Sequence, residues 1–333
     1  MSGASPSPSS DFSPPWFARG GQVQTILGYL LRRNLRWTLP VEDLVVESEP
    51  GIRILSRATW RPGERAASPA LILLHGMGGG DESTHLISMG LHAYAAGYHV
   101  IRMNMRGAGR SYEICPRLYN AGLEIDLIAV AEAVARMAPR VALFGASLGA
   151  NHVLLALGRS RSALPKGVRA AVAVSPPVDL LRCSDALHSP RNRIYLSRFV
   201  KDLKTSYVRI QQLNPGVYEA GREKGIRTVR EFDERITAPY AGFESAEEYY
   251  TRSSSGPWLK DIERRTLILH AEDDPMIPGD SVAKCDLPAS GLVKREILPT
   301  GGHLGFAAKT SAPGRFWAAE RALAFLEKPG RRD

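Results

Sequence analysis

Residues 145–149 read GASLG, which is the G-x-S-x-G pattern that places a serine where its hydroxyl can act as a nucleophile. A short apolar run, residues 141–144, comes directly before it, and a helical pattern over residues 148–157 follows. A sharp turn from strand to helix would project the hydroxyl of Ser147 above the edge of a sheet. Glycine is expected on both sides because side chains there would collide with the neighbouring strand and helix.

A serine hydroxyl needs a base to remove its proton, and histidine usually serves. Of the eight histidines, His303 follows the last predicted strand in a Gly-Gly-His loop, at the carboxyl edge of the sheet. The carboxylate that orients the imidazole is expected in residues 270–278, HAEDDPMIP. Pro275 disfavours helix at Asp274, which would hold that residue in the loop. We therefore choose Asp274, with Asp273 as the alternative.

The charge that develops on a carbonyl oxygen during acyl transfer requires hydrogen-bond donors. One candidate is the backbone N–H of Leu148, immediately after the predicted nucleophile. The other is expected from the glycine-rich loop HGMGGG, residues 75–80, where the N–H of Met77 is our candidate. His75 is expected to brace this loop. We expect no cofactor and no metal ion.

The elements that must position these residues show a regular alternation from residue 69 onward. Strands are predicted at residues 69–74, 99–105, 141–144, 168–174, 266–270 and 293–298, and helices at 83–96, 122–137, 148–157 and 313–326. This alternation indicates βαβ crossovers and a mostly parallel sheet with helices on both faces. Residues 41–47 and 52–60 predict an antiparallel hairpin at the sheet edge.

The alternation pauses between residues 178 and 265, a gap far longer than a crossover helix requires. We predict a mostly helical cap over residues 178–262, inserted into a core formed by residues 15–177 and 263–333. Residues 1–14, rich in serine and proline, are predicted to be a disordered tail.

The chain contains 43 Lys and Arg and 34 Asp and Glu residues, which gives it a net charge of +9. Residues 182–209 concentrate seven basic and two acidic side chains, and residues 30–37, LLRRNLRW, mix apolar with cationic ones. A solvated surface and selection of anionic substrates both fit the first segment. A solvated helix face and a peripheral membrane-surface contact both fit the second. No nucleic-acid partner is expected, because the sequence shows no recognisable module for one.

Hydrophobic residues make up 44% and charged residues 23% of the 333, which is typical of a globular protein with a sizeable core. Three widely spaced cysteines encode neither a disulfide framework nor a zinc site. We therefore expect a reducing, cytoplasmic location. The first 15 residues lack the features of a secretory signal, and the charge-free stretch 141–158 is interrupted by glycines and reads as strand and helix.

The chain order Ser147, Asp274, His303 is that of the α/β-hydrolases. The sequence resembles the YheT-like branch of this superfamily, bacterial relatives of animal abhydrolase-domain lipases, from about residue 16 to 306. The stretches that match the family pattern are Gln24-Thr25, residues 104–107, residues 119–122, residues 147–151, residues 232–243, Tyr249-Tyr250 and residues 271–275. Departures from the family pattern are Gly21-Gln22 in place of Gly-His, a second edge strand without its acidic residue, and Ala150 in place of glycine.

The resemblance implies an α/β-hydrolase fold with a cap and a carboxylic ester hydrolase, lipid esters being among the substrates. The small-molecule partner would be an ester or lipid, cleaved through an acyl-enzyme intermediate. Two alternatives stay open: an acyltransferase that uses the same acyl-enzyme, and a non-catalytic α/β-hydrolase that binds a ligand. The sequence does not indicate an oligomeric state.

Overall fold

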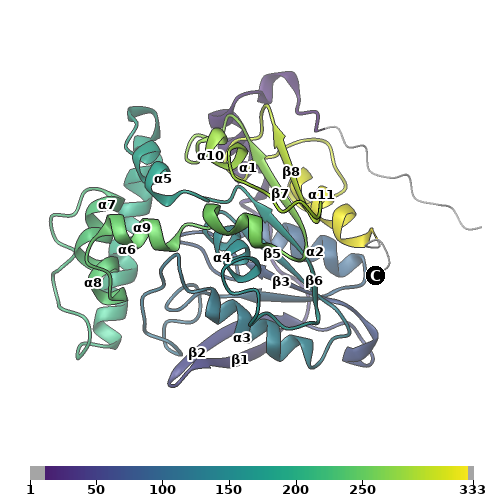
Figure 1. Cartoon of the computed structure of the whole chain (residues 1–333), viewed down its shortest axis with the longest axis horizontal. Helices are drawn as coiled ribbons and strands as arrows, with labels where there is room; N and C mark the ends of the chain where they lie inside the picture. The colour runs from purple at the N-terminus through teal and green to yellow at the C-terminus, as the bar shows by residue number, and fades with distance from the viewer. Residues whose placement is uncertain (1–11, 329–333) are drawn as a thin grey trace, which may run out of the picture.

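The computed structural model describes residues 12–328, so most of the predicted disordered tail lies outside the described residues. Eight strands form one sheet in the order β1-β2-β4-β3-β5-β6-β7-β8 (Figure 1). The strands are β1 (Glu42–Glu49), β2 (Ile52–Thr59), β3 (Ala70–Leu74), β4 (His99–Met103), β5 (Val141–Ala146), β6 (Val168–Val174), β7 (Arg265–Ala271) and β8 (Val293–Leu298).

Strand β2 pairs antiparallel with both of its neighbours, β1 and β4, and the other five pairings in the sheet are parallel. Strands β3 and β5 are buried at every position. Their continuous apolar sequences follow from this, since the inner strands of a parallel sheet are covered on both faces. The predicted hairpin and the mostly parallel sheet are both confirmed.

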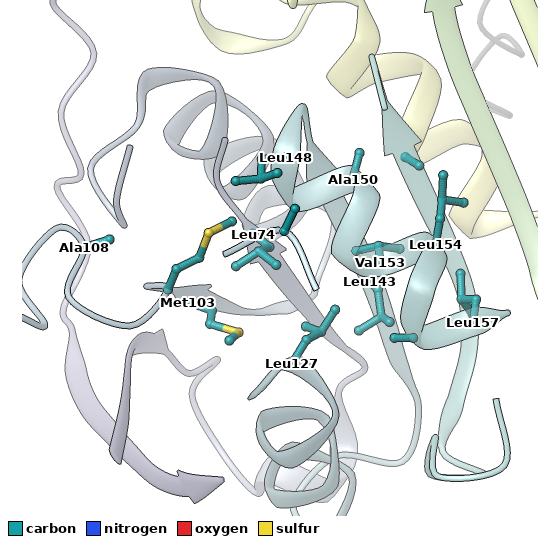
Figure 2. Close-up of a cluster of buried hydrophobic side chains, with 14 of the residues drawn as sticks. Leu74, Met103, Ala108, Leu127, Leu143, Leu148, Ala150, Val153, Leu154 and Leu157 are labelled. Carbon is teal, nitrogen blue, oxygen red and sulfur yellow. The ribbon is translucent and has the colours of Figure 1, made fainter. Parts of the chain in front are cut away.

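Two layers of helices cover the sheet. Helices α3 (Glu124–Ala135) and α4 (Leu148–Leu157) pack against each other in one hydrophobic cluster, part of which Figure 2 shows. Helices α2 (Thr84–Ala95) and α11 (Trp317–Glu327) pack together in a second cluster. Alternate residues of β3 enter the two clusters, Ile72 the first and Leu71 the second, so the clusters lie on opposite faces.

Between β6 and β7 the chain forms the helices that gather at one side of the sheet in Figure 1. They are α5 (Leu180–Leu187), α6 (Arg193–Leu213), α7 (Val229–Phe232), a π-helical turn η4 (Asp233–Thr237), α8 (Ala238–Ala241) and α9 (Ala246–Ser253), with 3₁₀ turns η3 (Pro190–Asn192) and η5 (Gly256–Asp261). We refer to residues 178–262 as the cap segment, and its status as a separate domain remains a prediction. No helix within residues 12–328 is both long enough and apolar enough to cross a membrane.

The last helix begins later than the sequence pattern predicts. Residues Pro313–Arg315 form a 3₁₀ turn, η6, and α11 starts only at Trp317. Gly314 and Arg315 have φ angles of 69° and 56°, which a right-handed helix cannot contain. The remaining short elements are two 3₁₀ turns, η1 (Trp16–Ala18) and η2 (Arg65–Ala67), and a short helix, α10 (Gly279–Ala283).

Helix α1 (Gly21–Arg32) was not among the elements predicted from the sequence. Its last residue, Arg32, is 4% exposed, and its guanidinium donates hydrogen bonds to the carbonyls of Leu304 and Gly305 at 2.6 and 3.0 Å. Neither alternative stated for residues 30–37, a solvated helix face or a membrane-surface contact, applies to Arg32, because these two buried carbonyls bind its charge.

Candidate active site

Ser147 lies at the sharp turn between β5 and α4, with φ 53° and ψ −122°. This strained conformation is typical of a nucleophile elbow. A Cβ added at Gly145 would lie 2.3 Å from the carbonyl oxygen of Gly149, and one added at Gly149 would lie 2.4 Å from the carbonyl oxygen of Leu74. Both glycines of the motif are thus required by the close approach of backbone to backbone.

The structure brings the three predicted triad residues into one hydrogen-bonded chain. The Nε2 atom of His303 lies 2.9 Å from the Oγ of Ser147, and its Nδ1 lies 2.9 Å from the Oδ2 of Asp274. Because the Asp274 carboxylate can only accept, Nδ1 carries a proton and Nε2 is free to accept one from the serine. This is the tautomer that a general base at Ser147 requires.

The Asp274 carboxylate is held in its charged form despite being buried. Desolvation alone would raise its pKa, but the charge and hydrogen bond of His303 and the backbone N–H of Met276 outweigh burial and lower the pKa below its ordinary value. Its Oδ1 accepts hydrogen bonds from the N–H groups of Met276 and Ile277 at 2.9 and 3.0 Å. The carboxylate is therefore both ionised and fixed in orientation.

The neighbouring acid, Asp273, does not contact the imidazole in this way. Its Oδ1 accepts from the N–H groups of Gly301 and Gly302 at 3.0 and 2.9 Å, and its Oδ2 accepts from the Thr300 hydroxyl at 2.6 Å. Asp273 thus shapes the loop that carries His303, while Asp274 orients the ring itself.

Helix α1 supports the same loop from the other side, a role that sequence reasoning missed. The Thr25 hydroxyl accepts a hydrogen bond from the N–H of His303 at 2.8 Å, and Gln24 accepts from the N–H of Ala307 at 2.7 Å. Arg32 binds the two carbonyls described above. The only signal in the sequence was the Gln24-Thr25 pair of the family resemblance, which gave no indication of what the pair contacts.

The candidate oxyanion donors lie at the start of α4 and in the loop of residues 75–80, which meet at Ser147. Leu148 is the first residue of α4, so its N–H has no partner within the helix. Met77 lines the same cavity as Ser147, and a Cβ added at the preceding Gly76 would lie 3.0 Å from the Cβ of Ser147. The absence of a side chain at Gly76 lets this loop approach the nucleophile.

His75 holds the loop that carries Met77 in place. Its Nδ1 lies 2.7 Å from the carbonyl oxygen of Gly76, and its Nε2 accepts a hydrogen bond from the N–H of Met105 at 3.1 Å. Burial lowers the pKa of His75 to about 4. His75 is therefore a neutral imidazole that donates one hydrogen bond and accepts another, which agrees with the bracing role expected for it from the sequence.

A cavity of about 250 Å³ opens above Ser147 and His303. Its lining comes from both the core and the cap segment, and most of it is apolar. The apolar cap residues are Leu180, Leu187, Phe199, Leu203, Val229 and Phe232. No group of three or more His, Cys, Asp or Glu within residues 12–328 is placed to hold a metal ion.

One polar cluster interrupts the apolar lining. Asp233, in the π-helical turn η4, accepts hydrogen bonds from the hydroxyls of Thr237 and Tyr250 at 2.6 and 2.7 Å, and all three residues line the cavity. Burial raises the pKa of Asp233 to about 6, although the two hydroxyls lower it in part. The cap side of the cavity thus holds a buried carboxyl group with a raised pKa.

The basic residues of segment 182–209 do not line this cavity, whose lining includes no Lys or Arg in the described part of the chain. Two of them are paired elsewhere: Arg182 with Asp280 and Arg198 with Asp202, each at 2.8 Å. These charges therefore lie on the outer surface of the cap segment and not around the cavity.

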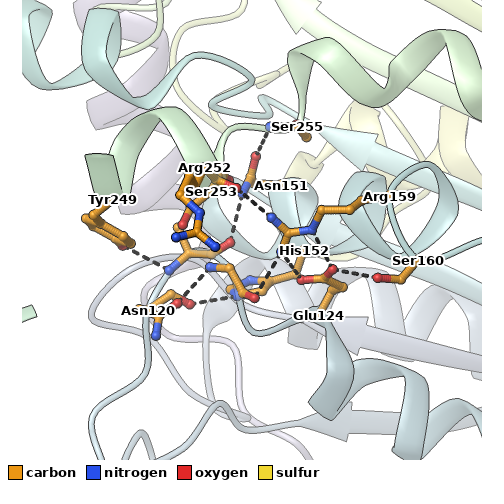
Figure 3. Close-up of polar contacts among 12 residues, drawn as sticks. Asn120, Glu124, Asn151, His152, Arg159, Ser160, Tyr249, Arg252, Ser253 and Ser255 are labelled. Atoms are coloured by element: carbon orange, nitrogen blue, oxygen red, sulfur yellow. Dashed lines mark hydrogen bonds and ion pairs between the residues drawn. The ribbon is translucent and has the colours of Figure 1, made fainter. Parts of the chain in front are cut away.

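Behind the nucleophile, α4 is tied to the cap segment by a polar network (Figure 3). The amide of Asn151 donates to the carbonyls of Ala121 and Ser253 at 3.0 and 2.8 Å, and its Oδ1 accepts from the N–H of Ser255. The Tyr249 hydroxyl accepts from the N–H of Ala121 at 2.9 Å. Several motif residues of the family resemblance therefore meet at one junction between nucleophile helix and cap.

Comparison with known proteins places the chain in a family. Residues 69–310 match the model of the alpha/beta hydrolase fold family. The sequence is 30% identical over 321 residues to the putative esterase YheT of Escherichia coli, covering 95% of this chain and 92% of that protein. It is also 30% identical over 277 residues to a monoacylglycerol lipase of Saccharomyces cerevisiae, covering 78% of this chain and 59% of the lipase.

Among solved structures, an esterase of Pyrococcus furiosus, Pf2001, superimposes with a TM-score of 0.57 at 13% identity, covering 88% of this chain and 94% of the esterase. At this identity the likeness concerns the fold alone. With the family model matching most of the chain and YheT matching nearly all of it, the chain belongs to the α/β-hydrolase family and is a relative of YheT.

Proposed function

We propose that this protein is a serine hydrolase that cleaves carboxylic esters through Ser147, His303 and Asp274. The observation that carries the proposal is the hydrogen-bonded chain from Ser147 Oγ through His303 to Asp274, with 2.9 Å at each link, at the base of an apolar cavity. The names of the relatives, among them a putative esterase, a monoacylglycerol lipase and a phospholipase, support the same reaction class.

In the first half-reaction, the Oγ of Ser147 attacks the ester carbonyl while its proton passes to Nε2 of His303. The ionised Asp274 stabilises the imidazolium that forms. The charge on the carbonyl oxygen is received by the N–H groups of Met77 and Leu148, next to the positive end of the α4 dipole. The tetrahedral intermediate collapses, Nε2–H protonates the leaving alcohol, and an acyl group remains on Ser147.

In the second half-reaction, a water molecule gives its proton to Nε2 of His303 and attacks the acyl carbon. Collapse of the second tetrahedral intermediate releases the carboxylic acid and returns the proton to Ser147. If an alcohol took the place of water, the same acyl-enzyme would yield a new ester.

The lining of the cavity supports an apolar acyl group as the part of the substrate that enters it. Phe199, Leu203 and Phe232 offer only hydrocarbon surface, and burial of that surface against an acyl chain stabilises the complex by about 25 cal/mol per Å². Lipid esters and other acyl esters fit this chemistry, in agreement with the lipase and phospholipase names of two relatives.

The proposal is tested by covalent labelling with a fluorophosphonate probe and by analysis of reaction products. We expect the label on the peptide that contains Ser147, and His303→Ala should slow labelling by at least about 10²-fold, because the base is lost. Hydrolysis of p-nitrophenyl esters should release one acid per alcohol. If the folded protein neither reacts with the probe nor cleaves these esters, it is better described as a non-catalytic ligand-binding protein.

A further inference from the structure

Helix α1 is packed with its polar and small residues inward and its apolar residues outward. The buried positions are Gly21, Gln24, Gly28 and Arg32. The exposed apolar positions are Val23, Ile26, Tyr29, Leu30 and Leu31, with exposed fractions of 45%, 49%, 58%, 45% and 36%. A surface helix normally turns its apolar stripe toward the core, so this arrangement is the reverse of the usual one.

The inward face explains why the helix cannot simply turn over. A Cβ added at Gly28 would lie 2.8 Å from the Cα of Gly305, so the helix needs glycine for this close approach. Thr25 and Arg32 bind backbone groups of the catalytic loop. These contacts fix the rotation of α1, and its apolar residues are therefore held toward solvent.

Two segments that contact the helix carry further exposed apolar residues. Trp16 and Phe17, in the turn η1 just before α1, are 81% and 62% exposed. The second segment is the beginning of α6, where the Tyr195 hydroxyl donates a hydrogen bond to the side chain of Gln22 of α1 at 2.6 Å. Ile194, which precedes Tyr195, is 80% exposed. We call the surface formed by these residues the α1 face; its members are Trp16, Phe17, Val23, Ile26, Tyr29, Leu30 and Ile194.

The two segments that carry the α1 face have charges of one sign. Residues 12–41 contain four arginines and no acidic residue, and Arg19, Arg33 and Arg36 are exposed. At the start of α6, the exposed Arg191 and Arg193 lie on either side of a buried asparagine. An exposed apolar area bordered by cations has the composition of a surface that binds anionic lipid headgroups and their acyl boundary.

We propose that the α1 face docks the protein on a membrane surface that contains anionic phospholipids. Apolar side chains at this face would enter the headgroup region, while the surrounding arginines contact phosphate groups. Pairing of two copies through the same face is disfavoured, because it would bring two sets of arginines together. The docked helix is the one that supports His303, so the membrane would lie directly outside the catalytic loop.

The experiment is sedimentation of the purified full chain with vesicles, without any substrate. Vesicles of phosphatidylcholine containing about one third phosphatidylglycerol are compared with pure phosphatidylcholine. We expect binding to the anionic vesicles that weakens by about tenfold or more when salt rises from 0.01 to 0.5 M, because the Debye length falls from about 30 Å to under 5 Å. Because no ester is cleaved in this assay, its result is independent of the proposed hydrolysis.

The decisive variant is Ile26→Glu, and its matched control is Ile125→Glu on α3, a position 45% exposed as against 49% for Ile26. Ile26→Glu should lower binding by about tenfold or more, since it removes an inserted side chain and adds a repelled charge. The control should bind like the parent. A second variant, Leu30→Ser, should weaken binding in the same direction, and circular dichroism with thermal unfolding shows that each variant is folded.

Three results would overturn the proposal. The parent could fail to sediment with anionic vesicles at low salt. Ile26→Glu and Ile125→Glu could lower binding equally, which would mean that the α1 face is not the contact. Finally, sedimentation velocity could show a dimer that Ile26→Glu dissociates, which would assign the face to a second copy of the chain.

Discussion

The two sides of the cavity are built on different physical principles. The floor is polar: Ser147 and His303 line it, the buried Asp274 lies behind His303, and hydrogen bonds of 2.9 Å join the three in a fixed order. The ceiling, supplied by the cap segment, is mostly hydrocarbon, and its polar groups include the buried cluster around Asp233 and the hydroxyl of Ser184.

This difference indicates that the floor carries out the chemistry and that the ceiling binds the substrate. Hydrogen bonds depend on direction, so a displacement at the floor disturbs proton transfer. Apolar contact is non-directional and scales with area, so the ceiling can change its residues while the chemistry below continues. We expect substitutions in the floor to change kcat and those in the ceiling to change substrate preference or stability.

The largest expected effect comes from comparing one serine on each side of the cavity. Ser147→Ala should lower kcat/KM for p-nitrophenyl esters by at least about 10³-fold, because the remaining donors cannot replace the nucleophile. Ser184→Ala, which alters a buried hydroxyl in the ceiling lining, should change it by less than about tenfold. Comparable losses in both folded variants would break the distinction between floor and ceiling.

The next effect separates the two adjacent acids. Asp274→Asn should lower kcat by about 10³- to 10⁴-fold with the fold retained, because an amide at this position favours the wrong imidazole tautomer. Asp273→Asn should cost far less, since an amide oxygen can still accept from the N–H groups of the His303 loop. Steady-state kinetics with both purified variants decide the assignment, and the reverse ranking would move the orienting acid to Asp273.

A smaller effect is expected for the ceiling carboxyl. The folded pKa of Asp233 is raised to about 6, above its unfolded value, so the folded state binds the proton more tightly. This contribution to stability is present below about pH 4 and is lost as pH rises to about 6, by about 1 to 3 kcal/mol. Denaturant unfolding of Asp233→Asn against the parent, between pH 4 and 7, measures it.

The free-energy difference between Asp233→Asn and the parent should move in favour of the variant as pH increases through this range. Background titration of other groups cancels in the comparison, since both proteins share them. A difference that stays constant with pH would mean that Asp233 titrates alike in the folded and unfolded chains.

The smallest effect concerns the basic segment 182–209. Its charges lie outside the cavity lining, so kcat/KM for a water-soluble anionic ester should change by less than about threefold between 0.01 and 0.5 M salt. A neutral ester of the same acyl length serves as the control. A steep fall with salt for the anionic ester alone would show that these charges steer the substrate, in which case the ceiling also selects by charge.

Much of the fold could be predicted because its signals are local. The runs in β3 and β5 are apolar throughout, as strands covered on both faces must be, and α4 follows its strand without interruption. The last helix was placed four residues too early, because backbone angles at Gly314 and Arg315 are not visible in an apolar pattern.

Helix α1 was not predicted because its sequence lacks the usual apolar pattern on the buried face. Periodicity identifies a helix when its apolar stripe faces the core, and here the inward positions are glycine, glutamine and arginine. The same reversal hid the supporting roles of Thr25 and Arg32, whose partners lie more than 270 residues away in the chain.

The sequence by itself determined the residue types of the candidate site, their order along the chain and the alternation that brings strand ends to one edge. Only the tertiary structure decided which of two adjacent carboxylates meets His303, because that choice depends on the direction of a side chain at a turn. It also decided that Asp233 enters the cavity while the arginines of the cap segment stay outside. Burial and hydrogen-bond direction are properties of packed surfaces, and residues distant in the chain create them together.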